Sequence, residues 1–351
     1  MKRTFAAFVV LGVIAATLFA ASPAYAAYPG HNGRIAFQAD TGGGNQIYTV
    51  RPNGHDLFQV THVAGGATTP DWSPNGHLIA FSLNECTVAM IHPDGKGMRV
   101  VPSQTPGGCE TDPAFTPDGH HLVFERFDPA NSDDAIWIMQ LNGTGRHRHG
   151  TGPGGAATPE VSPDGQTVTF LSFTPNDLTA IFAVDIHGGP VRQVTPTLNG
   201  ITFKHDWAPD GSRLVMSDNA DNPDLTVNVV TIRPDGTGLK YLTDNQTPDQ
   251  RALAGGYSPN GKWIVFRQES GDQSEGSPPP APIKPRAAGR PSKRRIGPWQ
   301  IVLFLRAGGP YQGAPERPPD LHSSARSNRR PQLCKALCDS RPVSVYSRRG
   351  A

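Results

Sequence analysis

Two acidic segments carry side-chain oxygens of the kind that bind calcium. Residues 128–134 read Asp-Pro-Ala-Asn-Ser-Asp-Asp, and residues 218–224 place Asp218, Asp221 and Asp224 at every third position. Ca²⁺ takes about six to eight oxygen ligands, which binding loops supply at a defined spacing. Neither segment has that spacing. We therefore interpret both as solvated polar loops and expect no bound metal or other cofactor.

The other residue types that catalyse reactions do not form a familiar catalytic pattern. Twelve histidines are present, and no pair of them combines with a carboxylate at the spacing of a metal site. No Gly-x-Ser-x-Gly segment supplies a nucleophilic serine, and no glycine-rich loop has the pattern of a phosphate-binding loop. The sequence therefore predicts a protein without catalysis, with its histidines on the surface.

A short turn recurs along the chain and indicates which elements position these residues. Its pattern is Ser, Thr or Ala, then Pro, then Asp or Asn, then Gly, and a degenerate copy ends at Gly33. Successive turn glycines are 43, 43, 46, 46 and 50 residues apart. Proline presets φ, the Asp or Asn side chain bonds to the backbone ahead, and glycine adopts the positive φ that closes a hairpin. The complete turns end at Gly76, Gly119, Gly165, Gly211 and Gly261.

Bulky residues recur at fixed distances from the glycine of each of these first turns. A bulky residue lies four positions before each glycine and another lies five positions after it, as Trp72 and Phe81 do around Gly76. A second glycine turn follows 19 to 25 residues later, between β-branched or aromatic segments. The pattern predicts an all-β repeat of four strands, a to d, in which first turns join a to b and second turns join c to d. Four-stranded repeats of roughly 40–50 residues are typical of β-propeller blades.

The repeats resemble the WD-like propeller repeat of the TolB family. The resemblance is carried by residues 71–76, Asp-Trp-Ser-Pro-Asn-Gly, and by residues 206–211, Asp-Trp-Ala-Pro-Asp-Gly. It implies a six-bladed β-propeller in an envelope or secreted protein. The sixth copy stops after its strand b, so within residues 27–270 we expect five full blades and an incomplete sixth. The first copy lacks strand a, and the strand-like residues 299–305 are a candidate to replace the segment that closes the ring.

The two ends of the chain differ from the repeats. Residues 1–26 have the charged start, apolar stretch and small-residue pattern of a secretory signal peptide cut after Ala26, with an uncleaved anchor as the alternative. Residues 271–351 carry 15 Lys/Arg and 5 Asp/Glu, against 15 and 25 in residues 28–270. We interpret this Pro/Arg-rich tail as disordered or translated out of frame. A genuine basic tail that binds acidic polymers and a divergent closing segment are the alternatives.

Two cysteines fall on one face of the predicted ring. Cys86 lies in a b–c loop and Cys109 in the following d–a loop, and the blade arrangement makes these loops neighbours. Export permits oxidation, so we predict a Cys86–Cys109 disulfide. Two free thiols are the alternative, and geometry decides between them.

These features predict an exported, non-catalytic scaffold that is secreted or periplasmic. We expect it to bind a protein or a cell-envelope polymer through the face formed by the b–c and d–a loops. The acidic body is a poor match to nucleic acid, and no membrane association is expected after signal cleavage. Two alternatives stay open: a metal-dependent propeller hydrolase or lyase, and a truncated, non-functional gene copy.

Overall fold

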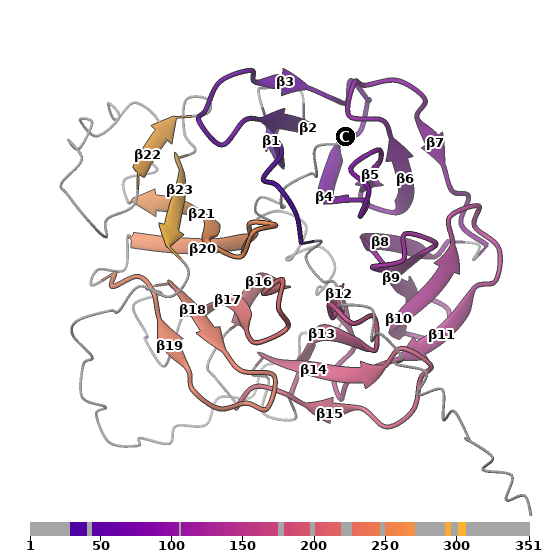
Figure 1. Cartoon of the computed structure of the whole chain (residues 1–351). Helices are drawn as coiled ribbons and strands as arrows, with labels where there is room; N and C mark the ends of the chain where they lie inside the picture. Colours follow the sequence, from indigo (N-terminus) through magenta and orange to yellow (C-terminus); the bar gives the residue numbers. More distant parts are fainter. Residues whose placement is uncertain are drawn as a thin grey trace, which may run out of the picture.

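The structure is a computed structural model that describes residues 29–40, 44–104, 107–174, 179–196, 201–218, 227–245, 250–270, 292–295 and 301–306. The regular elements in these residues are all β-strands. Among the described residues no helix is long and apolar enough to cross a membrane. Six antiparallel sheets stand around a common axis as the blades of a propeller (Figure 1), and we number them blades 1 to 6 in chain order. The predicted signal peptide lies outside the described residues.

The first strand of each blade is nearest the axis, and the other strands follow outward in chain order, except that in blade 6 β23 lies between β21 and β22 (Figure 1). In that order the strands are β1 (Ile35–Asp40), β2 (Asn45–Val50) and β3 (Phe58–Gln59) in blade 1; β4 (Ala67–Trp72), β5 (Ile79–Leu83), β6 (Thr87–Ile91) and β7 (Arg99–Val100) in blade 2; β8 (Cys109–Phe115), β9 (His121–Asp128), β10 (Asp133–Gln140) and β11 (His147–Gly150) in blade 3; β12 (Ala157–Val161), β13 (Thr167–Phe173), β14 (Thr179–Asp185) and β15 (Arg192–Gln193) in blade 4; β16 (Ile201–Trp207), β17 (Leu214–Asp218), β18 (Asn228–Ile232) and β19 (Lys240–Tyr241) in blade 5; and β20 (Gln250–Tyr257), β21 (Trp263–Ser270), β23 (Ile301–Arg306) and β22 (Ser292–Arg295) in blade 6.

The incomplete sheet is blade 1, not blade 6. Five sheets have four strands each, whereas blade 1 has three in the described part of the chain. The prediction that blade 6 lacks its outer strands was wrong, because β23 pairs with β21 and β22 pairs with β23. This pairing satisfies backbone groups of β21 that would otherwise form an open edge. The strand-like segment near residue 301 thus completes blade 6 instead of pairing with β1. The remainder of the predicted tail lies outside the described residues.

The ring closes through side chains and turns between blades 1 and 6. Val265 of β21 packs with residues of β1 and β2 in one buried cluster, which contains Ile35, Phe37, Tyr48 and Val50. At the turns, the Gly30 amide donates to the Pro259 carbonyl at 3.1 Å. Apolar burial between neighbouring sheets therefore substitutes for a shared closing sheet.

The first turns form an inner circle of contacts on one face of the ring. Their five glycines have φ between 65° and 71°, a region that suits glycine. Each glycine after Gly76 lies against the proline of the preceding blade's turn, and a Cβ on Gly211 would come within 3.2 Å of the Pro163 ring. The other contacts are Gly119 with Pro74, Gly165 with Pro117 and Gly261 with Pro209. We call this side the turn face, and the opposite side, with the b–c and d–a connections, the loop face.

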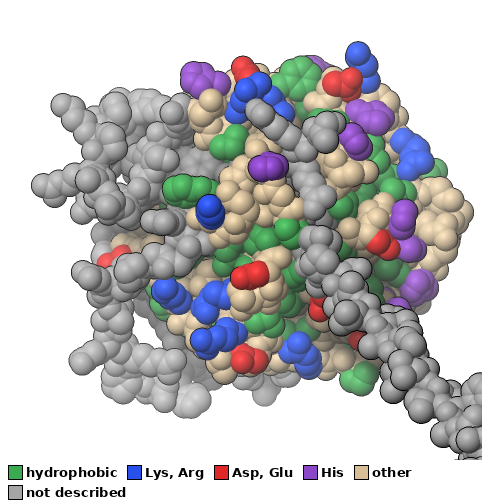
Figure 2. All heavy atoms as spheres, in the orientation of Figure 1, with side chains coloured by type: hydrophobic (Ala, Val, Ile, Leu, Met, Phe, Trp, Pro, Cys, Tyr) green, Lys and Arg blue, Asp and Glu red, His purple; other side chains and the backbone are tan. Residues whose placement is uncertain are grey.

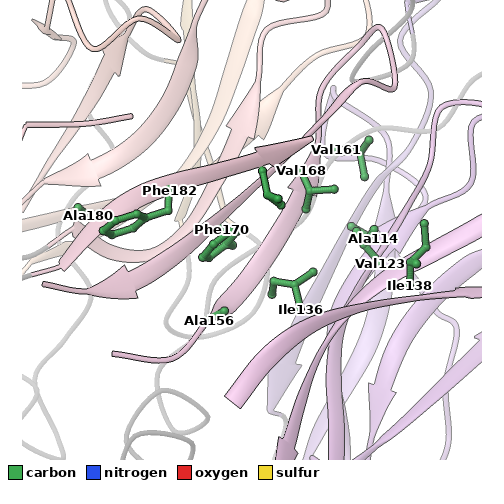
Figure 3. Close-up of a cluster of buried hydrophobic side chains, with 11 residues drawn as sticks. Ala114, Val123, Ile136, Ile138, Ala156, Val161, Val168, Phe170, Ala180 and Phe182 are labelled. Atoms are coloured by element: carbon green, nitrogen blue, oxygen red, sulfur yellow. The ribbon is translucent and has the colours of Figure 1, made fainter. Parts of the chain in front are cut away.

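The core consists of apolar layers between neighbouring blades. Figure 3 shows the layer between blades 3 and 4, in which Ile136 and Ile138 of β10 face Val161, Val168 and Phe170 of blade 4. The rings of Phe170 and Phe182 stack with centroids 6.2 Å apart. Residues four before and five after each turn glycine are thus the ones that fill these layers, as Trp72 and Phe81 do in blade 2.

Candidate functional site at the axis of the ring

The innermost strand of each blade from 2 to 6 has a β-bulge. At three of the bulges, Thr69, Asp112 and Thr158 have φ of 48° to 50°, in the left-handed region. A bulge leaves a backbone N–H outside its own ladder. A side chain of the preceding blade accepts that hydrogen bond at three bulges, in the pairs Thr69 N–Gln38 Oε1 (2.7 Å), Asp112 N–Ser82 Oγ (2.9 Å) and Ala254 N–Ser217 Oγ (2.6 Å).

A cluster of four charged side chains lies beside these bulges. We call it the axial cluster, and it consists of Asp71, Glu160, Lys204 and Asp206 from strands β4, β12 and β16. Lys204 Nζ is 3.1 Å from Glu160 Oε1, and these two side chains retain only 17% and 12% of their exposure. The negative charges of Asp71 and Asp206 also stabilise the Lys204 ammonium and act to raise its pKa. One cation is therefore shared by three carboxylates from three blades.

Burial shifts the proton affinities of the axial cluster. It raises the pKa of Glu160 to about 8 and that of Asp206 to about 7, although Lys204 opposes both shifts. Burial also raises the pKa of Asp71. For Lys204, burial lowers the pKa, but the three carboxylates outweigh it and the net shift is upward. The cluster thus holds a charged lysine together with carboxyl groups that titrate near neutral pH.

Two of the carboxylates also join neighbouring blades. Asp71 accepts a hydrogen bond from the Phe115 amide at 2.8 Å, and Asp206 accepts one from the Tyr257 amide at 2.7 Å. In chemical terms the cluster can exchange a proton or hold a cationic group. No three His, Cys, Asp or Glu side chains in the described residues are grouped so as to hold a metal ion.

The sequence interpretation missed the axial cluster, although a signal was present. Asp71, Glu160 and Asp206 each lie five positions before a first-turn glycine. That shared offset places them on equivalent positions of three innermost strands. Lys204 has no basic counterpart at the same offset from the first-turn glycine in the other blades. Its contact with Glu160 becomes visible only in the folded structure.

Of the three metal candidates, Asp218 alone lies in the described residues. Asp218 is fully buried at the end of β17 and accepts a hydrogen bond from the Tyr241 hydroxyl at 2.8 Å. Asp221 and Asp224 lie outside the described residues. In the other acidic segment, Asp128 accepts the Ala130 amide at 3.0 Å, and Asp133 pairs with Arg148. These carboxylates therefore have local structural partners.

Histidines are not confined to the surface, contrary to the expectation from sequence. His205 is 1% exposed, and burial lowers its pKa to about 3. Its Nε2 lies 2.8 Å from the hydroxyl of Thr169 in blade 4, and Trp207 Nε1 donates to the same hydroxyl at 3.0 Å. One hydroxyl thus satisfies two aromatic side chains of the next blade.

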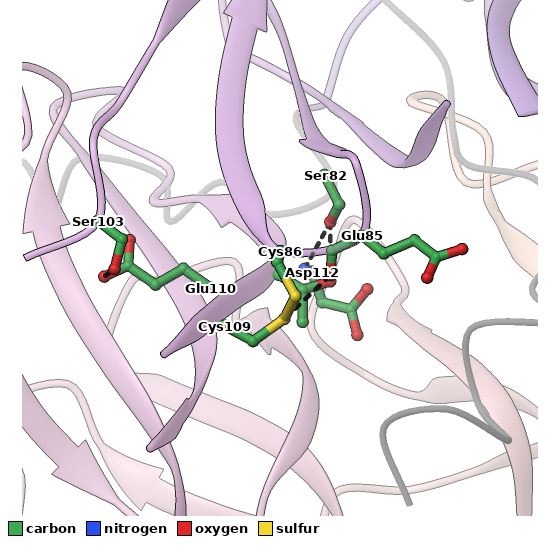
Figure 4. Close-up of a disulfide and its surroundings, with 8 residues drawn as sticks. Ser82, Glu85, Cys86, Ser103, Cys109, Glu110 and Asp112 are labelled. Atoms are coloured by element: carbon green, nitrogen blue, oxygen red, sulfur yellow. Dashed lines mark hydrogen bonds between the residues drawn. A yellow bond between two sulfur atoms is a disulfide. The ribbon is translucent and has the colours of Figure 1, made fainter. Parts of the chain in front are cut away.

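On the loop face, blades 2 and 3 are covalently linked. Cys86 and Cys109 form a disulfide with Cα atoms 4.3 Å apart (Figure 4). Next to it, the Glu110 carboxylate pairs with Arg146 at 2.5 Å, and these side chains are 1% and 6% exposed. Ser103 also donates to Glu110 at 3.1 Å (Figure 4). The disulfide thus joins the b–c loop of blade 2 to the start of β8, whereas the Glu110–Arg146 pair lies within blade 3.

Comparison with known proteins agrees with this architecture. The family model of the TolB β-propeller domain matches residues 96–276, about half of the chain. Among curated proteins, the chain is 27% identical to the TolB homolog of Chlorobium luteolum over 206 residues, 58% of this chain and 45% of that protein. It is 24% identical to the uncharacterized peptidase YuxL of Bacillus subtilis over 203 residues, 48% of this chain and 31% of that protein. The chain therefore spans less than half the length of these relatives.

Solved structures show the same fold. TolB from Acinetobacter baumannii superposes with a TM-score of 0.57 at 17% identity, covering 79% of this chain and 64% of that one. A putative TolB from Agrobacterium tumefaciens gives a TM-score of 0.51 at 19% identity, covering 66% of this chain and 86% of that one. With the recurrent turns, the ring of sheets and the family match in agreement, this chain belongs to the TolB β-propeller family.

Proposed function

We propose that this protein is an exported binding scaffold that presents its loop face to a protein or a cell-envelope polymer. The observation that carries the proposal is the covalent linkage of blades 2 and 3 on that face by the Cys86–Cys109 disulfide. Rigid connections lower the entropy lost when a surface binds a partner. One relative is named as a protein of the Tol-Pal system, which supports a role in the cell envelope.

The residues at the axis support a scaffold because several of them hold the ring together. Asp71 and Asp206 accept inter-blade hydrogen bonds, and Glu160 is paired with Lys204. Groups with such partners stabilise the blades. Binding by the scaffold is then expected on the connections at its surface.

A capture experiment with matched variants tests the proposal. Glu85 is an exposed residue of the b–c loop next to Cys86, whereas Gln166 is an exposed residue of a first turn on the opposite face. Immobilised full-length protein, Glu85→Lys and Gln166→Lys would each be exposed to cell-envelope extract. We expect one partner to be retained by wild type and Gln166→Lys and lost from Glu85→Lys. Loss with Gln166→Lys alone would contradict the loop-face assignment.

A second function, acid–base catalysis at the axis, is supported by the raised pKa of Glu160. A carboxyl group that titrates near pH 8 in a protected site has the property of a general acid. This hypothesis predicts hydrolase or lyase activity on an envelope polymer that Glu160→Gln abolishes without loss of folding. Activity that persists in Glu160→Gln would exclude Glu160 as the acid.

A further inference from the structure

A pocket of about 240 Å³ opens on the turn face between blades 5 and 6. First-turn residues of both blades line it, together with Arg213, Lys240 and Tyr257. Figure 2 shows Lys and Arg side chains gathered over the region where Figure 1 draws β17 to β20. The pocket is smaller than the roughly 300–1,000 Å³ typical of drug-sized ligands, so it suits a small ion or chemical group.

Arg213 is held in place by blade 5 itself. Its guanidinium donates to the Thr231 hydroxyl and carbonyl, both at 3.0 Å, and to the Gly238 carbonyl. Blade 1 repeats this arrangement, since Arg34 donates to the hydroxyl and carbonyl of Thr49. The arginine is therefore part of the blade architecture, and it adds a fixed positive charge to the pocket wall.

Lys240 is the residue that distinguishes this pocket. It pairs across the strands with Thr231, the residue that holds Arg213. Two other blades have an arginine at the corresponding position of strand d, and each has a partner: Arg99 donates to the Leu141 carbonyl (2.5 Å) and Arg192 donates to the Pro234 carbonyl (3.3 Å). Blade 3 has His147 at this position. Within the described part of the chain, the Lys240 ammonium has no recorded hydrogen-bond or ion-pair partner.

The charges around the pocket do not balance. Among the described residues, Asp210 is the one carboxylate in the lining, and it accepts hydrogen bonds from the Ser212 amide (3.0 Å) and hydroxyl (2.6 Å). Burial acts to raise the pKa of Asp210, but these bonds outweigh it and the pKa is lowered. The lining thus carries two cations and one carboxylate that already has local donors. An anion would relieve the repulsion between the two cations.

We propose that this pocket binds a small oxyanion, the phosphate or carboxylate group of a ligand, with Lys240 as its charged contact. Arg213 supplies a second positive charge whose position is set by Thr231. The pocket lies on the turn face, so this binding is independent of the loop-face partner.

Isothermal titration of the full chain at low ionic strength tests the assignment. The probes are inorganic phosphate, glucuronate and glucose, which separate phosphate, carboxylate and neutral sugar. The variant is Lys240→Gln, and Lys96→Gln is the control because it removes an exposed lysine of blade 2 with the same change in charge. We expect at least one of the two anions to bind, and Lys240→Gln to weaken that binding by roughly tenfold while Lys96→Gln leaves it unchanged.

The outcomes are distinct. Binding of phosphate alone assigns the pocket to phosphate groups, and binding of glucuronate alone assigns it to carboxylates. Equal affinity in wild type and Lys240→Gln, binding of glucose as strong as that of the anions, or the absence of binding by both anions would each overturn the proposal. Matching thermal unfolding curves for the two variants would show that any difference comes from the pocket and not from the fold.

Discussion

Replacing Thr169 by Val should destabilise the ring far more than a change of one hydroxyl on an ordinary surface. The side chain keeps its shape, but Trp207 Nε1 and His205 Nε2 both lose their partner in blade 4. Trp207 is 5% exposed and His205 is 1% exposed. Water therefore does not readily replace the lost hydroxyl as a hydrogen-bond partner. Each buried polar group left without a partner costs about 1–3 kcal/mol.

We therefore expect Thr169→Val to lower the free energy of unfolding by about 2–4 kcal/mol. Blade 2 offers the reciprocal experiment. Ala36 precedes Phe37 as Thr169 precedes Phe170, and Trp72 Nε1 is buried without a hydrogen-bond partner. Ala36→Ser should supply that partner and raise the free energy of unfolding by about 0.5–1.5 kcal/mol.

Urea denaturation followed by tryptophan fluorescence measures both changes. A control variant, Thr167→Val, removes a hydroxyl from the same strand of blade 4 at a half-buried position. We expect it to change stability by less than about 0.5 kcal/mol. If Thr169→Val were as mild as this control, the shared hydroxyl would not join blades 4 and 5, and the reasoning would be refuted.

Three further predictions concern other parts of the ring. Truncation after Ser270 removes β22 and β23 and exposes the edge of β21. We expect the truncated protein to have a lower melting temperature and to self-associate in light scattering. A truncated protein that stays monomeric and equally stable would contradict the pairing of β23 with β21. The pKa of Glu160 rises from its ordinary 4.5 to about 8 on folding, so between these pH values the native state holds a proton that the unfolded chain releases. The free energy of unfolding should therefore fall as the pH rises from 4.5 to about 8, by about 1.4 kcal/mol per pH unit from this group. Denaturation at several pH values should show a flatter profile for Glu160→Gln, and an unchanged profile would refute the shift. Replacing Cys86 and Cys109 together by Ala removes a crosslink between residues 23 positions apart and should cost about 3 kcal/mol in denaturation against the oxidised wild type. The reduced wild type should behave like the variant, and equal stability of the oxidised wild type and the variant would contradict this prediction.

The repeat architecture could be predicted from sequence because local chemistry dictates it. A first turn such as residues 73–76 closes its own hairpin, with the Gly76 amide donating to the Ser73 carbonyl at 2.8 Å. Its proline and glycine also contact the turns of other blades, so the same residues recur at each blade. The spacing of such turns was sufficient to indicate four-stranded sheets in a ring.

The outer strands of blade 6 could not be predicted because their pairing is non-local. β23 joins β21 across thirty intervening residues, 271–300, whose content of Pro, Arg and Gly does not predict a strand. The pairing of β23 with β21 depends on the open edge of β21, and the sequence of a single segment does not indicate which distant edge it will pair with.

The axial cluster and the buried histidine were missed for a related reason. A bulge changes the direction of the side chains that follow it, so alternation along β16 does not predict where Lys204 and Asp206 point. The partner of His205 lies in another blade, 36 residues away. Both features arise where blades meet, and they depend on blade packing more than on the sequence of one strand.

Site-specific photo-crosslinking tests the proposed function most directly. A photoreactive amino acid would be placed at position 85 on the loop face, or at position 166 on the turn face, of the full chain in native cell envelopes. Binding through the loop face predicts a discrete crosslinked product at position 85 and none at position 166. A product at position 166 alone, or the absence of any product at position 85, would contradict it.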